Sequence, residues 1–176
     1  MLNGIALFLL AAQSPAPVAG IPPDWELKPR VEQIGTEVAR LRPLLNQLQP
    51  EKWTAAGAPQ AYEKQYKECL RGIDSVQSAA AGLAAQPSKL SLAVETLVRI
   101  ESLMQLNSSV SQAVRRYQNP AVADLLDSEI TAAGISREWL RRHVADLAAV
   151  REKELEVAEQ EAQKCRGQAA RPGVRK

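Results

Sequence analysis

The sequence predicts an all-α protein, an antiparallel bundle of four long helices. The first observation is composition: 45% of the 176 residues are hydrophobic, yet only 4% are aromatic, and 28 are alanine. A chain rich in Ala, Leu, Glu, Gln and Arg favours helices over strands. The second observation is periodicity, because apolar residues recur every three or four positions along most of the chain. The length is sufficient for one domain with its own hydrophobic core.

The first long helix is indicated by an apolar seam over residues 31–48. Pro43 interrupts this seam and lacks a backbone donor, so we expect a kink or a restart there. Pro50 suits the first position of a helical turn and Gly57 suits the residue just past its end. A short helical turn is therefore expected at residues 50–56. The seam consists of Val31, Ile34, Val38, Leu41, Leu45 and Leu48.

The second long helix is expected to start at Pro59 and to end at Gln86-Pro87. Ser88 follows directly and is a suitable N-cap for the third long helix. The seams of the two helices predict that they pack side by side. They consist of Tyr62, Tyr66, Cys69, Ile73, Val76, Ala80 and Leu83, and of Leu90, Val94, Leu97, Ile100, Met104, Val110, Val114 and Tyr117.

Asn119-Pro120 marks a kink or a stop in the third helix. We expect a third helix kinked near Pro120 that continues to a turn at Gly134; in the alternative, residues 119–135 cross the end of the bundle. Ser136 is placed to cap the last helix, which is apolar on one face before residue 151 and strongly polar after it. That helix is expected to stop at Gly167.

The amino terminus has the order of parts of a signal peptide. An apolar run over residues 5–12 precedes small residues and prolines, and it is far shorter than the roughly 20 residues of a membrane-spanning helix. We expect a signal peptide over residues 1–20, a helical bundle domain over 21–167 and a disordered basic tail over 168–176. The mature chain would be periplasmic or extracellular, without a stable membrane span.

Two cysteines in an exported chain suggest one disulfide, between Cys69 and Cys165. The bridge depends on the topology. If the third helix continues past Pro120 to the turn at Gly134, the two cysteines lie level. If residues 119–135 cross the bundle end, the cysteines lie about 24 Å apart and no bond can form. We expect the bridge, and with it the extended third helix.

The three tryptophans are expected to cover apolar core at the ends of the bundle. Trp53 lies in the short turn after the first helix, and Trp139 and Trp25 lie near helix starts. Large rings near bundle ends more often cover core than bind a ligand. We therefore interpret Trp53 and Trp139 as bundle-end caps rather than as a binding platform.

No catalytic, metal or cofactor motif stands out. The single histidine, His143, excludes a metal site with two imidazoles from one chain, and no C-x-x-C, glycine-rich phosphate loop or G-x-S-x-G pattern occurs. A haem held by Met104 and His143 is disfavoured, because the two residues are expected at different heights in the bundle. The net charge of +2 gives no overall case for nucleic acid.

The sequence therefore predicts an exported, non-catalytic helical bundle that binds a protein or a component of the cell envelope. The alternative is a binder of a small ligand or cofactor in the bundle interior. The charged run over residues 151–164 is interpreted as a solvated helix face with a coiled-coil-like composition, or else as a docking surface for a partner helix.

Overall fold

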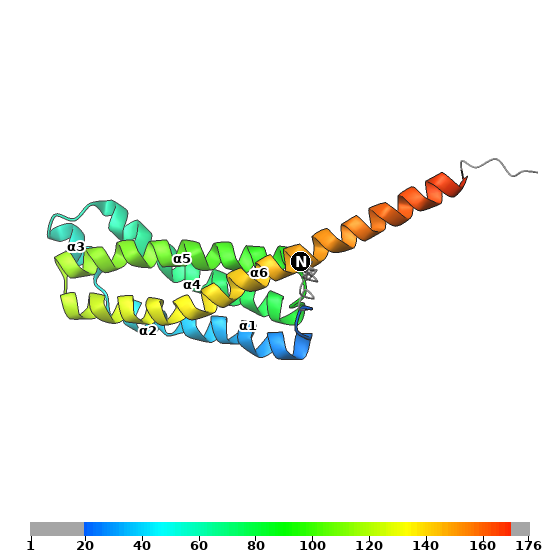
Figure 1. The fold of residues 1–176 in the computed structure, drawn as a ribbon. Coiled ribbons are helices and arrows are strands. Elements are labelled where there is room, and N and C mark those ends of the chain that lie inside the picture. Colours follow the sequence, from blue (N-terminus) through cyan, green and yellow to red (C-terminus); the bar gives the residue numbers. More distant parts are fainter. Residues whose placement is uncertain (1–19, 170–176) are drawn as a thin grey trace, which may run out of the picture.

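The computed structural model describes residues 20–169, with side chains described up to Gly167. This part of the chain is helical and contains no strand, so the predicted all-α bundle is confirmed (Figure 1). The helices are α1 (Asp24–Ala39), α2 (Leu41–Leu45), α3 (Pro50–Ala55), α4 (Gln60–Ala85), α5 (Leu90–Tyr117) and α6 (Pro120–Ala169).

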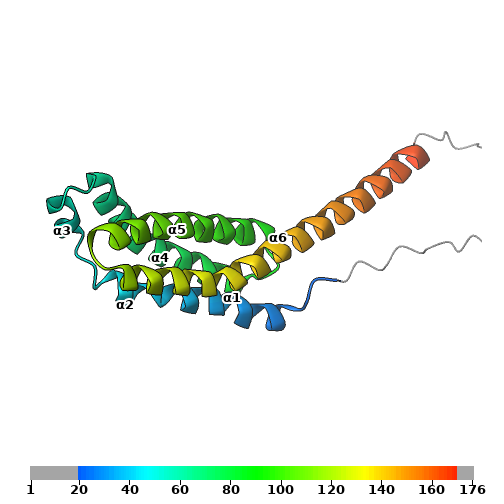
Figure 2. The same ribbon diagram turned by 60° about the vertical axis from the view of Figure 1, so that its left-hand side comes forward.

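Four long helices form a ring in which each contacts two neighbours. Helix α4 packs on α5, α5 on α6, α6 on α1, and α1 on α4, while the backbones of the diagonal pairs α1/α5 and α4/α6 do not approach closely within the described residues. Neighbours in the ring run antiparallel (Figures 1 and 2). One end of the ring carries α3 and the α5–α6 turn, and we name it the capped end. The other, where α6 leaves the bundle, is the open end.

The break between α1 and α2 follows from Pro43. A proline cannot donate to the carbonyl four residues earlier, and that residue is Ala39, the last of α1. The chain restarts as α2 at Leu41, as the sequence indicates. The predicted short turn is also present as α3, and Gly57 beyond it has φ of +90°, a conformation that glycine adopts without a steric penalty.

Most residues of the predicted seams lie in the core or pack against it, but Val94 of the third seam is 41% exposed, and the adjacent Ala93 takes the buried position. The buried positions of α1, α4 and α5 pack against each other and against α6. Helices α4 and α5 approach closely at Gly72, where an added Cβ would lie 3.2 Å from Cδ1 of Leu103. The largest fully buried side chains of the ring are Ile34, Leu41, Leu45, Ile73, Leu83, Ile100, Leu103, Leu126, Leu140 and Leu147.

The prediction of a third helix that continues past Pro120 is wrong. Helix α5 ends at Tyr117, and the chain reverses at Gln118 and Asn119. The side chain of Asn119 caps the next helix, because its Oδ1 accepts a hydrogen bond from the Ala121 amide at 2.9 Å. Pro120 occupies the first turn of α6, where its missing donor costs nothing. Asn119-Pro120 is thus a helix start rather than a kink.

The predicted turn at Gly134 and the predicted cap at Ser136 are also wrong. Helix α6 runs through both positions, and Ser136 is buried within it at 8% exposure. Glycine in a helix interior costs up to about 1 kcal/mol, which packing readily offsets. The buried positions of α6 recur in phase on both sides of Gly134: they are Leu126, Ala133, Leu140 and Leu147.

Ser88 does not cap α5, contrary to the sequence expectation. Its hydroxyl donates instead to Oδ1 of Asp24 at 2.6 Å, and Lys89 occupies the N-cap position without a side-chain hydrogen bond. This contact ties the α4–α5 connection to the start of α1 at the open end. The predicted stop at Gly167 is wrong as well, because α6 continues to Ala169.

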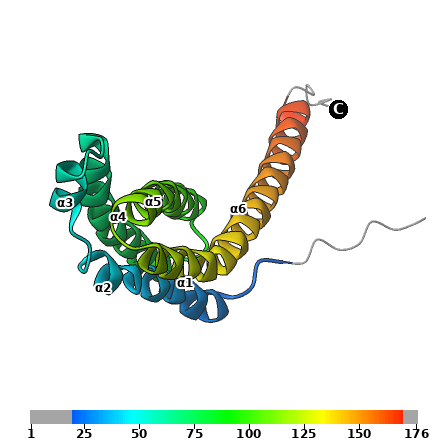
Figure 3. The ribbon, with the colours of Figure 1, turned by 90° about the vertical axis from the view of Figure 1, so that its left-hand side faces the viewer.

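Helix α6 is much longer than the ring that it helps to build. Its 50 residues extend about 75 Å, whereas the 28 residues of α5 extend about 42 Å. Leu147 is its last buried residue, and residues 151–167 are all exposed. Figure 3 shows this half of α6 standing away from the other helices. We name residues 151–169 the projecting segment.

Candidate interaction surface

Trp53 is an internal part of the capped end. Its side chain is 1% exposed and meets the ring of Tyr66 edge-on, with centroids 6.2 Å apart. The indole Nε1 donates a hydrogen bond to Oε1 of Gln118 at 2.9 Å. A ring that is covered on all sides and whose donor is already used offers no platform to a ligand.

Gln118 joins the two connections at the capped end. Besides the Trp53 indole, its Oε1 accepts the backbone N–H of Gln49 at 3.1 Å, and its Nε2 donates to the Gln47 carbonyl at 3.4 Å. One amide side chain from the α5–α6 turn thus fixes the α2–α3 segment. No local pattern indicates this role, because the contacts join residues about 70 positions apart.

Trp139 lies toward the open end, away from Trp53. It follows the start of α6, at the capped end, by 19 residues, or about 28 Å, so Trp53 and Trp139 do not share one cap. Trp139 stacks on His143 with centroids 5.3 Å apart, and the Arg30 guanidinium lies 6.0 Å from the indole centroid. His143 Nε2 donates to the Pro87 carbonyl at 2.9 Å, so this nitrogen is already used.

Trp25 does not cover the core. The side chain is 73% exposed at the start of α1, although the sequence interpretation placed it with the other two tryptophans. Leu27, two residues later, takes the buried position. The first turn of α1 therefore packs against the bundle through Leu27, whereas Trp25 was expected to cover the core.

The predicted disulfide between Cys69 and Cys165 is absent, and both thiols are free. Cys69 is fully buried in α4, whereas Cys165 is exposed on the projecting segment. Cys165 lies 22 residues, or about 33 Å, beyond His143, which contacts Pro87 at the far end of α4. That separation is several times the limit for a disulfide. The prediction of a disulfide is wrong because it depended on an extended third helix, and that helix does not form.

The two thiols differ in reactivity for a physical reason. Burial raises the pKa of Cys69 to about 12, since the thiolate would be desolvated in the core. The same burial raises the pKa of the neighbouring Tyr66, and the negative charge of Glu51 adds to that shift. Cys165 is the accessible thiol of the pair.

One polar side chain lies unpartnered in the core. Asn107 on α5 has no exposed surface, and neither its Nδ2 nor its Oδ1 hydrogen-bonds to another described residue. A buried amide without partners costs free energy. The local sequence does not indicate that this asparagine is buried, because helical spacing alone does not tell whether a polar residue lies within the apolar seam or just beside it.

The central part of the projecting segment is negatively charged, and the cations Arg151, Lys164 and Arg166 flank it. Residues 152–163 contain five glutamates and one lysine, a formal net charge of −4, although the whole chain is +2. Glu154 pairs with Arg151 at 2.6 Å, and the other four glutamates make no ion pair with described residues. Two apolar side chains are also exposed here, Leu155 at 60% and Val157 at 48%.

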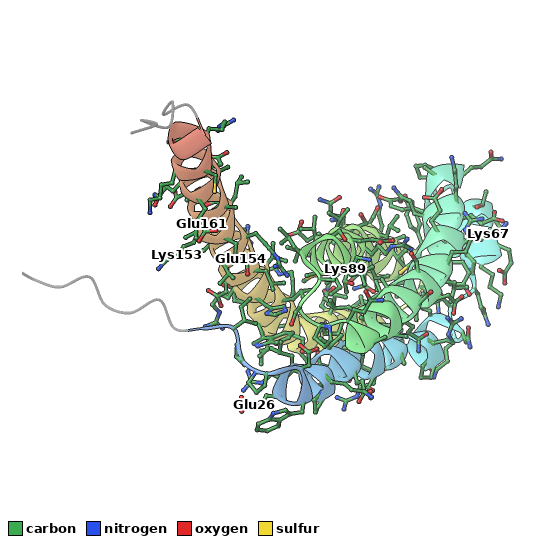
Figure 4. All side chains as sticks on the ribbon, turned by 90° about the vertical axis from the view of Figure 1, so that its right-hand side faces the viewer. Glu26, Lys67, Lys89, Lys153, Glu154 and Glu161 are labelled. Carbon is green, nitrogen blue, oxygen red and sulfur yellow. The ribbon has the colours of Figure 1, made fainter. Side chains whose placement is uncertain are left out.

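A surface groove of about 470 Å³ runs along the base of this segment. Figure 4 labels three of its residues, Lys153, Glu154 and Glu161, on the part of α6 that stands clear of the bundle. We name it the α6 groove. Its lining consists of Gly20, Ala149, Val150, Lys153, Glu154, Val157, Ala158 and Glu161.

The geometry defines the chain as a four-helix bundle with a single-helix extension. Within residues 20–169 no group of three or more His, Cys, Asp or Glu side chains is arranged to hold a metal ion, and no helix has an apolar stretch that would span a bilayer. The chain matches no protein-family model, and comparison with curated proteins and with solved structures gives no match.

Proposed function

We propose that the protein is an exported, non-catalytic binding protein that presents its projecting segment to a protein or to a component of the cell envelope. The observation that carries this proposal is the exposure of residues 151–167 on every face of a helix. Side chains that pack on nothing within their own chain contribute no tertiary stability to the fold. Their arrangement is accounted for by contact with another molecule.

The bundle supports such a role by holding the segment helical. An isolated helix of this length is marginal in water, because nucleating the first turn is unfavourable. In α6 the bundled half supplies the nucleus, and the projecting segment adds only propagation steps by strong helix formers such as Glu, Ala, Gln and Lys. A partner therefore meets a preformed helix and avoids most of the ordering cost.

The interior of the ring favours protein binding over the small-ligand alternative. Its central positions are occupied by Leu, Ile and Val side chains that pack in one contiguous core. The α6 groove lies on the surface of the molecule instead. A ligand within the ring would have to displace core side chains, at the cost of several kcal/mol for each large residue.

A truncation after Arg151 tests the proposal. Because the side chains of residues 152–167 are all exposed in the part of the chain that the structure describes, the truncated protein is expected to unfold at about the same temperature as the full chain. A partner recovered in stoichiometric amount with the full chain from native extract should be lost with the truncated one. Equal recovery with both forms, or none with either, would contradict the proposal.

Export is tested separately on protein from the native host. The mature chain is expected to begin between residues 13 and 21, a range that lies almost wholly outside the described residues. Recovery of intact Met1 would refute this part and leave the binding role open to the truncation experiment.

A further inference from the structure

We propose that the α6 groove binds a basic amphipathic helix of another protein. This inference rests on the proposed function and specifies the site and the partner chemistry. The groove continues the face of α6 that packs in the bundle. Residues seven apart lie close to one line, which drifts by about 20° per heptad around a straight α-helix, and this line passes without a break from core residues to groove residues. Its members are Leu126, Ala133, Leu140, Leu147, Glu154 and Glu161.

The spacing of the groove residues fits a helix as the occupant. Val150, Glu154, Val157 and Glu161 alternate in steps of three and four, the spacing by which one helix packs against another. Within the bundle the equivalent face of α6 is covered by α1 and α5. Beyond Leu147 both neighbours have ended, so no helix among residues 20–169 covers this face, and Gly20, ahead of α1, lines one side of the groove. From Val150 to Glu161 it extends about 16 Å, three turns of a partner.

The carboxylates along this face of α6 require a partner with basic side chains. In the bundle the members of the seven-residue line are leucine and alanine, but in the groove they are Glu154 and Glu161, flanked by Val150 and Val157. A helix docked on the valines would partly desolvate both carboxylates. Such burial is unfavourable unless cationic groups face the carboxylates. The partner therefore carries Lys or Arg seven residues apart, beside apolar residues that contact the valines.

A second copy of this chain does not meet that requirement. Pairing two projecting segments would bring two stretches of net charge −4 together, and like charges across a helix interface are destabilising. Of the two cations beside the groove, Arg151 is already paired with Glu154 of its own helix. Lys153 lines the groove but stands on the same helix as five glutamates, so the groove region of a second copy would remain negative. Charge complementarity thus selects a different protein with a basic helix.

The test uses two synthetic 21-residue helical peptides and the full chain. Both peptides carry the same leucine seam, and they differ only in having two lysines or two glutamates seven residues apart on its edge. Fluorescence anisotropy of the labelled peptides is expected to show binding of the lysine peptide and at least tenfold weaker binding of the glutamate peptide. Equal affinity of the two peptides would overturn the proposal.

Matched variants locate the binding face. The substitutions E154Q/E161Q and E152Q/E159Q each remove two charges with the same spacing, but the second pair lies on the opposite side of the helix. The first is expected to weaken the lysine peptide about fivefold or more at low salt, and the second less than twofold. Equal losses of affinity would mean that binding depends only on the overall negative charge of the segment. They would overturn the proposed docking face.

An apolar pair completes the design. Val157→Ser removes a groove contact and is expected to weaken binding at least threefold, whereas Leu155→Ser, on another side of the helix, should change it little. The reverse order would move the site to the Leu155 face and refute the groove. Circular dichroism of each variant checks that α6 remains helical.

Sedimentation tests whether a second copy of the chain occupies the groove. A concentration-dependent dimer that V157S disrupts would make a second copy the occupant and overturn the basic partner. A native partner that is lost on truncation, yet is insensitive to E154Q/E161Q and to V157S, would leave the proposed function standing and refute the groove.

Discussion

Replacing Trp53 with alanine tests the role of the capped end in the stability of the bundle. Trp53 is 1% exposed, contacts Tyr66 and donates to Gln118. Removing a fully buried aromatic ring costs about 3–5 kcal/mol, from lost transfer free energy and the cavity that remains. Loss of the indole hydrogen bond is part of this sum, at about 1 kcal/mol. We expect a total loss near 4 kcal/mol.

The measurement is urea unfolding followed by circular dichroism, with Trp25→Ala as the control. Trp25 is the same residue type in the same chain but is 73% exposed, so its replacement should change stability by less than about 0.5 kcal/mol. For a domain of this size, a loss of 4 kcal/mol corresponds to a fall in Tm of roughly 8–16 °C.

A double-mutant cycle separates the hydrogen bond from the packing. Trp53→Phe retains a ring without the indole donor, and Gln118→Ala removes its acceptor. We expect a coupling energy near 1 kcal/mol between the two. If Trp53→Ala lost less than 1 kcal/mol, or matched Trp25→Ala, the ring would not be holding the capped end together, and the argument from burial would be refuted.

Four further predictions concern the cysteines and helix α6. Native protein should show one fast-reacting thiol, Cys165, and Cys69 should react only on unfolding; two fast thiols would contradict the buried position of Cys69. Because unfolded Cys69 ionises near 9.0 and folded Cys69 near 12, stability is intact below pH 9 and should fall by up to roughly 1.4 kcal/mol per pH unit above it, a slope that Cys69→Ala reduces. Gly134→Ala should stabilise by about 0.5–1 kcal/mol in urea unfolding, since an added Cβ meets no atom within 4 Å; destabilisation would point to a turn there. Asn119→Ala should cost about 1 kcal/mol, while Asn119→Asp retains the cap; equal effects would exclude capping by this side chain.

Helix existence and the core seams were predictable because each depends on local spacing. The seams of α1 and α4, most of the seam of α5, the restart at Pro43 and the turn at α3 appear in the structure, whereas Val94 of the α5 seam is exposed. These features follow from a period of 3.6 residues and from the missing donor of proline, neither of which needs tertiary information. The length of each helix was the weaker part of the prediction.

Topology near the α5–α6 turn was mispredicted because two local signals were weighted wrongly. Asn119-Pro120 is a cap followed by a first-turn proline, but it was interpreted as a kink. Gly134 was interpreted as a terminator, although the seven-residue line through Leu126, Ala133 and Leu140 continues across it in phase. That unbroken phase was the available signal for one continuous helix.

The candidate interaction surface could be predicted only in part from the sequence. The run over residues 151–164 was recognised as charged, with a docking face as one interpretation. That it stands clear of every other helix could not be inferred, because this depends on where α1, α4 and α5 end relative to α6. The contacts of Gln118 and the unpartnered Asn107 likewise depend on segments that meet only in the folded chain.

The absence of any break in α6 fixes the direction in which the groove faces. Each residue of an α-helix turns the following side chains by about 100° and advances them by 1.5 Å. Leu147 and Glu161 are 14 residues apart, so Glu161 lies about 21 Å beyond the last buried leucine and about 40° around the helix from it. A single residue inserted between them would turn the groove toward another quadrant, whereas seven would nearly restore its azimuth and place it about 10 Å farther out. The direction in which the groove faces and its distance from the bundle are thus set by the number of residues between Leu147 and the groove.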